Sequence, residues 1–138
     1  MDKLRVYSLR KHEILRRKHL ISLLFRGGKS AKGEFLRIVY ASLEPESQSF
    51  QGVPSILFTV GKKTISSAVR RNRVKRMMKE AYRLEKKNIQ SDAESRNDGI
   101  INGKLCIAFI YMDRKKILPG LEAFRDEIRG LSGGMTFS

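Results

Sequence analysis

Apolar residues near the start of the chain recur at a helical period. Ile21, Leu24 and Phe25 fall at positions i, i+3 and i+4, so they share one face of a predicted helix over residues 17–26. Gly27 and Gly28 follow directly, and glycine often ends helices because it tolerates positive φ. The pattern therefore predicts a short amphipathic helix with a firm end.

The next segment, residues 34–42, is rich in β-branched and aromatic residues and predicts a strand. Because successive side chains of a strand point to opposite faces, two sets are expected on opposite sides. These sets are Phe35, Arg37 and Val39 on one side, and Leu36, Ile38 and Tyr40 on the other.

Two further segments predict strands. Residues 55–61 follow a polar stretch with two prolines and a glycine, which we interpret as a hairpin connection from the preceding strand. Residues 104–112 are the most apolar part of the chain and predict a central, doubly buried strand. A short additional strand is also compatible with residues 61–65.

Two longer amphipathic helices complete the pattern. The first is predicted over residues 68–87, with Ser66 or Ser67 as its N-cap. At 100° per residue its apolar face holds Val74, Met77, Met78 and Ala81, and its opposite face holds Asn72, Lys75, Arg76, Lys79 and Arg83. The second is predicted over residues 117–131, with the stripe Leu121, Phe124, Ile128 and Leu131. One face of each helix is expected to pack.

The order helix, strand, strand, helix, strand, helix predicts one α/β domain over residues 1–138. We expect an α+β two-layer sandwich, in which a small mixed sheet carries helices mainly on one face. A chain of 138 residues with 41% hydrophobic content is suited to a single folded core. Residues 88–103 have no apolar period and predict a mobile surface loop, and residues 1–16 predict a basic N-terminal segment.

Positive charge is concentrated in two segments. The chain has 29 Lys and Arg against 14 Asp and Glu, a net charge of +15. Residues 1–29 and residues 70–87 each carry nine basic and two acidic side chains, and the remainder is nearly neutral. Such dense basic segments favour a polyanionic partner, because each phosphate contact releases counterions. A membrane surface fits less well, since the apolar face of the second segment is needed for the core.

Groups for protein-borne catalysis are scarce. His12 and His19 lie seven residues apart, which is too far for a paired metal site on a helix. Cys106, the single cysteine, sits inside an apolar strand, so we expect a core residue and a reducing compartment. Glu44 and Glu46 flank a proline without a partnered base. We therefore expect no metal site and no catalytic residue in the protein.

The densest motif is AVRRNRVKR, residues 68–76. Arginine grips phosphate through a planar fork, lysine supplies a point charge, and asparagine can donate and accept toward bases or sugar hydroxyls. No acidic residue occurs between Arg70 and Lys79. The consecutive side chains 71–73 point in different directions around one helical turn. This arrangement suits contacts with the backbone of a structured RNA better than contacts with successive base pairs along a groove.

At this motif the sequence resembles the bacterial ribonuclease P protein family. The family's lysine pair, Ala-Val, Arg-Asn-Arg and Lys-Arg elements correspond to Lys62-Lys63, Ala68-Val69, Arg71-Asn72-Arg73 and Lys75-Arg76. The N-terminal stretch LRKHEILRRKHLISLLFRGG is similar as well, with Phe25 and Gly28 at matching places. The chain departs from the family pattern at Ile21, where an aromatic is usual, at Ser66, and at Thr64, which resembles an insertion.

The resemblance implies a ribosomal S5 domain 2-like fold and two groups of site residues. The residues that would contact the catalytic RNA are Arg70, Arg71, Asn72, Arg73, Lys75, Arg76 and Lys79. The residues that would bind the 5′ leader of precursor tRNA, in a cleft between the first helix and the open sheet face, are Ile21, Phe25, Leu36, Ile38, Tyr40, Lys62 and Lys63. The RNA subunit would supply the endonuclease chemistry, with Mg²⁺ bound mainly by that RNA.

The implied partners are ribonuclease P RNA and precursor tRNA in the bacterial cytoplasm, with no membrane and no obligate protein partner. Two other classes share the charge pattern. A ribosomal or RNA-chaperone-type RNA-binding protein would bind RNA without raising precursor tRNA cleavage. A basic DNA-binding helix protein would need a dimer and paired half-sites for specificity.

Overall fold

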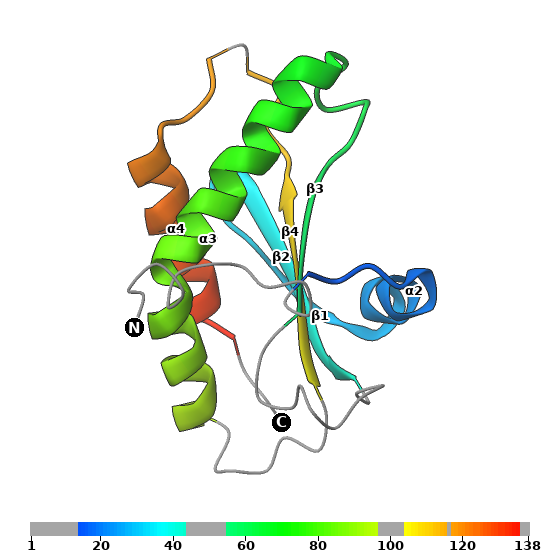
Figure 1. The fold of residues 1–138 in the computed structure, drawn as a ribbon, viewed down its shortest axis with the longest axis vertical. Helices are drawn as coiled ribbons and strands as arrows, with labels where there is room; N and C mark the ends of the chain where they lie inside the picture. Colours follow the sequence, from blue (N-terminus) through cyan, green and yellow to red (C-terminus); the bar gives the residue numbers. More distant parts are fainter. Residues whose placement is uncertain (1–13, 44–54, 97–103, 116, 136–138) are drawn as a thin grey trace, which may run out of the picture.

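The chain folds as a mixed sheet between two unequal layers of helix (Figure 1). The computed structural model describes residues 14–43, 55–96, 104–115 and 117–135. The elements are α2 (Lys18–Gly27), β1 (Lys29–Lys32), β2 (Leu36–Leu43), β3 (Ser55–Val60), α3 (Ala68–Arg96), β4 (Lys104–Tyr111) and α4 (Leu121–Gly133). Helices α3 and α4 cover one face of the sheet and α2 lies on the other. The predicted α/β sandwich with helices mainly on one face is confirmed.

The strands are arranged in the order β1-β2-β4-β3. β1 pairs with β2 and β2 with β4 in antiparallel fashion, whereas β3 and β4 are parallel and joined through α3. The predicted hairpin between residues 34–42 and 55–61 is therefore wrong, because β4 inserts between those two strands. The hairpin of this sheet is instead formed by β1 and β2.

Strand β1 is the element that hydrophobic periodicity missed. All four of its residues are exposed and only Ala31 is apolar, so it carries no alternating signal. The additional strand considered around residues 61–65 is instead a turn, in which the amides of Thr64 and Ile65 both donate to the carbonyl of Gly61 at 3.1 Å. Backbone pairing, and not burial, holds β1 at the sheet edge.

The main core lies between the sheet and helices α3 and α4. Val74, Met78 and Ala81 are fully buried on the predicted apolar face of α3, and Phe124 and Ile128 are fully buried on α4. Aliphatic strand residues pack against them, together with a set of aromatic rings in stacked, tilted or edge-to-face pairs. These rings are Phe35, Phe58, Phe109 and Tyr111 on the side of the sheet, and Tyr82 and Phe124 on the two helices. Both predicted helical stripes are thus confirmed.

A smaller apolar cluster holds α2 against the other face of the sheet. Leu15 and Leu24 pack there with Val39, Cys106 and Ala108. Cys106 is 2% exposed, which confirms that it is a core residue. Alternate residues of β4 therefore serve the two cores, which explains why this strand is apolar throughout.

Helix α2 ends at Gly27, where the sequence predicts its end. The reason for glycine at the next position, Gly28, differs from the predicted one. Gly28 has φ −77°, so no positive φ is involved. A Cβ at Gly28 would lie 2.5 Å from the carbonyl oxygen of Leu24 and 3.0 Å from that of Tyr40. Glycine is needed here because two backbones approach closely where α2 turns into β1.

Helix α3 begins where the sequence predicts and ends later. Its first turn is capped by Ser67, whose hydroxyl oxygen accepts a hydrogen bond from the Arg70 amide at 3.3 Å, which confirms the expected N-cap. Residues 88–96, predicted to lie in a loop, continue the helix to Arg96. This stretch contains neither glycine nor proline, so nothing in it stops a helix already begun. The rest of that predicted loop, residues 97–103, lies outside the described residues.

An ion-pair cluster joins α3 to α4. The Glu85 side chain is 2% exposed and accepts hydrogen bonds from Arg125 at 3.2 Å and Arg129 at 2.5 Å. The hydrogen bond from Arg129 is the main cause that lowers the pKa of Glu85. The charge of Glu85, one of the two acidic residues in the second basic segment, is therefore turned inward and does not neutralise the exposed face of α3.

Candidate nucleic-acid interface

The outward face of α3 carries the positive charge that the sequence predicted. Asn72, Arg73, Arg76 and Lys79 are exposed, and Lys75 is half-buried beside them. Asn72, Arg76 and Lys79 lie on the side of the helix opposite the buried residues Val74 and Met78, and Arg73 and Lys75 flank that side. The structure thus separates a packing face from a solvent-facing basic face along one helix.

Arg71 has a structural task at the start of this face. Its Nη1 atom donates hydrogen bonds to the backbone carbonyls of Ile65, at 2.9 Å, and Ser66, at 2.7 Å. These bonds hold the turn that precedes α3 against the first turn of the helix. The resemblance groups Arg71 with the RNA-contacting residues, and the structure adds a positioning role that the motif alone does not indicate.

The exposed basic row ends at Lys79 because the next cation is paired. Arg83 donates to both carboxylate oxygens of Glu80, at 3.0 Å and 2.5 Å. This bidentate hydrogen bonding lowers the pKa of Glu80 and raises that of Arg83.

More cations surround the end of the molecule where α3 and α4 begin. Since β3 and β4 are parallel, their carboxyl ends lie at the same edge of the sheet. Exposed lysines and arginines follow both strands: Lys62, Lys63, Arg114 and Lys115. The expected lysine pair is therefore in the β3–α3 turn, near the start of the Arg-Asn-Arg helix.

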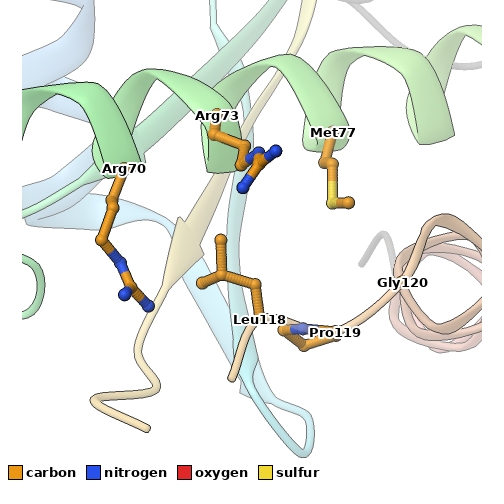
Figure 2. A pocket seen from close by; sticks show the side chains of 6 residues that line it. All are labelled: Arg70, Arg73, Met77, Leu118, Pro119 and Gly120. Atoms are coloured by element: carbon orange, nitrogen blue, oxygen red, sulfur yellow. The ribbon is translucent and has the colours of Figure 1, made fainter. Parts of the chain in front are cut away.

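A pocket of about 370 Å³ opens at this same end. Figure 2 shows Arg70, Arg73 and Met77 projecting from α3 toward the segment of Leu118, Pro119 and Gly120 that leads into α4. The hydrophobic pattern of residues 117–131 predicted the helix but gave no indication of this pocket. Leu118 itself points back toward α3.

The predicted leader site is wrong in its strand residues. Leu36, Ile38 and Tyr40 are 0%, 0% and 6% exposed and belong to the core beneath α3 and α4. They therefore do not line a cleft on the side of α2. Ile21 is half-buried and packs on the α2-side cluster, while Phe25 is 44% exposed.

The side chains of β2 that face α2 belong to the other alternating set. Val39 and Ala41 pack in the α2-side cluster, and Arg37 shares their side of the strand. Strand pairing aligns Arg37 with Lys32 on β1 and Ile110 on β4, and Ile110 in turn with Thr59 on β3. This row, Lys32-Arg37-Ile110-Thr59, places two exposed cations beside two half-buried side chains.

The remaining sequence features concern metal ligands, isolated polar residues and membrane spans. Within the described residues, no three His, Cys, Asp or Glu side chains gather in a way that could hold a metal ion. His19 is exposed, whereas His12, Glu44 and Glu46 lie outside the described residues, as does most of the N-terminal basic segment 1–16. Among the helices described, none combines the length and apolar character needed to cross a bilayer.

Comparison with known proteins decides the family. The model of the family described as Ribonuclease P matches residues 9–104. The chain belongs to the ribonuclease P protein family. A ribonuclease P protein component from Chlorobium phaeobacteroides is 41% identical over the whole chain and 94% of the relative. One from Chlorobaculum tepidum is 44% identical over 91% of the chain and 80% of the relative. The resemblance seen at the Arg-Asn-Arg motif is confirmed.

Solved ribonuclease P proteins have the same fold. The protein from Staphylococcus aureus superposes with a TM-score of 0.62 at 15% identity, covering 88% of this chain and 93% of the other. The protein from Thermotoga maritima gives a TM-score of 0.60 at 23% identity, covering 91% and 99%. At these identities the likeness shows shared architecture, and the site residues of this ribonuclease P family member follow from its own geometry.

Proposed function

We propose that the chain binds ribonuclease P RNA through the exposed face of α3 and assists removal of the 5′ leader from precursor tRNA. The RNA subunit carries out the hydrolysis, with Mg²⁺ held mainly by the RNA, and gives the mature 5′ end. The observation that carries this proposal is the row of exposed Arg73, Arg76 and Lys79 in a chain of the ribonuclease P family.

The physical contribution of this basic face is electrostatic. Two RNA molecules that meet in a cleavage complex repel each other through their phosphates, and Mg²⁺ screens that repulsion. Side-chain cations fixed on a rigid helix supply part of this screening and release condensed counterions on binding. The protein therefore lowers the Mg²⁺ concentration needed for cleavage.

Leader contacts belong on the α2 side of the sheet. Lys32 and Arg37 supply positive charge, and Ile110 and Thr59 extend their row across the sheet. Phe25, 44% exposed on α2, offers an aromatic surface of the kind that single-stranded nucleic acids stack upon. The bacterial origin of the relatives supports a place in the bacterial cytoplasm, with ribonuclease P RNA and precursor tRNA as partners.

Reconstitution tests the function. Added to a bacterial ribonuclease P RNA at a Mg²⁺ concentration where the RNA alone is nearly inactive, the protein is expected to raise precursor tRNA cleavage at least tenfold. Cleavage is measured from the release of an end-labelled leader. An unchanged cleavage rate would refute the proposed function.

A protease step separates this function from that of an RNA chaperone. The RNA is folded with the protein, and the protein is then digested before substrate is added. A chaperone is no longer needed once the RNA has folded, so activity would persist. For a resident subunit, activity is expected to return to the level of the RNA alone.

Substitutions at neighbouring positions of β2 test the leader surface. Arg37→Ala is expected to weaken binding of precursor tRNA by roughly fivefold near 0.1 M salt, the loss of about one phosphate contact. Binding of tRNA without a leader should not change. Ile38→Ala, directed into the core, is expected to lower the free energy of unfolding by about 2–4 kcal/mol and to leave the precursor-to-product affinity ratio intact. Equal ratios for Arg37→Ala and the wild type would exclude Arg37 from the leader site.

A further inference from the structure

The pocket between α3 and the start of α4 combines positive charge with an apolar surface. Arg70, Arg73 and Met77 are spaced i, i+3 and i+7, so they lie along one stripe of α3 facing Leu118 and Pro119 (Figure 2). Arg73 is exposed, while Met77 and Leu118 are half-buried and pack on the edge of the main core. None of the six lining residues is acidic.

The geometry points to a binding site for one unpaired nucleotide of the RNA partner in this pocket. The guanidinium groups of Arg70 and Arg73 bind the phosphate, and the base packs on Met77, Leu118 and Pro119. This inference rests on the proposed function, because it places a specific nucleotide contact within the RNA interface of α3. It adds a shape-dependent contact to what is otherwise a charged surface.

Charge and shape together select this occupant. A phosphate alone would use the positive charge but leave the apolar side chains uncovered, and a purely apolar ligand would make no use of the exposed guanidinium of Arg73. The volume of about 370 Å³ is at the small end of the range for ligand pockets, which suits a single nucleotide and not a base pair. Only an unpaired nucleotide, outside a duplex, presents both its phosphate and the face of its base to a protein.

The start of α4 adds to the attraction for phosphate. Its N-cap is Gly120, which has no side chain to accept hydrogen bonds from the amides of the first turn. Glu122 in that turn carries negative charge, and Arg125 offsets it through an ion pair at 3.3 Å. The exposed cations Lys62, Lys63, Arg114 and Lys115 occupy the loops at the same end of the sheet and favour a polyanionic strand over a neutral ligand.

A matched pair of substitutions tests the apolar part of the site. Leu118→Ala removes the surface for the base, while Ile117→Ala changes the adjacent residue, which is 87% exposed and does not line the pocket. Leu118→Ala is expected to weaken binding to ribonuclease P RNA by roughly tenfold, because the base loses its apolar contact with three carbon atoms. Ile117→Ala should bind like the wild type, and Leu118→Met should restore binding.

The salt dependence distinguishes the two halves of the site. Leu118→Ala removes no charge, so its plot of log Kd against log salt concentration should run parallel to that of the wild type. Arg73→Gln should reduce the slope by about one. Urea unfolding of each variant checks that the fold is intact, and Leu118→Met covers the case in which Leu118→Ala is destabilised.

Crosslinking identifies the occupant. With a benzoylphenylalanine photocrosslinker in place of Leu118, ultraviolet light should join the protein to one unpaired nucleotide of ribonuclease P RNA. Crosslinks to a second protein chain, or none to RNA, would overturn the inference, as would equal RNA affinity of Leu118→Ala and Ile117→Ala. If the wild-type protein does not stimulate cleavage, the proposed function fails; if it stimulates and the two variants behave alike, only the nucleotide site fails.

Discussion

Replacing Arg73, Arg76 and Lys79 together by glutamine is expected to weaken binding to ribonuclease P RNA by roughly 100-fold or more near 0.1 M salt. All three side chains are exposed along α3. Each phosphate contact contributes about 0.7–0.9 to the slope of log K against log salt concentration, so the slope should fall by about two to three. Filter binding at several salt concentrations measures both quantities.

A second triple variant controls for the loss of net charge. Arg16, Lys18 and Arg26 are also exposed, and they lie in or beside α2. Their replacement by glutamine removes the same charge, and it is expected to reduce affinity only through weaker long-range attraction, with a smaller change in slope. Equal losses from the two triple variants would show that net charge, and not the face of α3, governs RNA binding.

The helices of this protein were predictable because each has a local signature. Val74, Met78 and Ala81 share a face at 3.6 residues per turn, and all three are fully buried. The hydroxyl of Ser67 caps α3 as the sequence suggested. The end of α3 was not predictable from periodicity, since residues 88–96 extend the helix without an apolar stripe to mark it.

Strand order and strand face depend on distant parts of the chain and were harder to predict. A polar connection between two strands suggested a hairpin, but β4, about fifty residues later in the sequence, pairs with both β2 and β3. The alternation of β2 separated two sets of side chains correctly, yet it could not show which set faces α2. The resemblance implied that Leu36, Ile38 and Tyr40 line the leader cleft, but they lie on the opposite face of the sheet. A shift of one residue along a strand is enough to move a side chain from one face to the other.

The candidate interface likewise has one part that could be predicted from the sequence and two parts that could not. The basic face of α3 follows from residue types and helical spacing alone, so it was found in the sequence. Arg37, Ile110 and Thr59 come into one row only through the pairing of three strands. The pocket beside Leu118 forms where α3 lies against the segment that leads into α4, and no pattern within either segment predicts this contact.

Removing the carboxylate of Glu127 is expected to destabilise the fold more than any exposed substitution on α4. Its Oε1 atom accepts a hydrogen bond from the Glu34 amide at 2.7 Å. Its Oε2 atom accepts from the amides of Phe35, at 2.9 Å, and Leu36, at 2.5 Å. Three successive amides at the β1–β2 turn thus converge on one anion and tie the hairpin to α4.

Glu127→Ala leaves these amides without their acceptor, and those of Phe35 and Leu36 belong to buried residues. The expected loss is about 3 kcal/mol in the free energy of unfolding, measured by urea denaturation followed by circular dichroism. Glu127→Gln keeps one oxygen, which can serve two of the three amides, so its loss should be about half as large. Glu122→Gln, on the same helix with a side chain that is 78% exposed, is the control and should change stability by less than about 0.5 kcal/mol. If Glu127→Ala were no more costly than this control, solvent would be replacing the carboxylate, and the hairpin would not depend on α4 for its position.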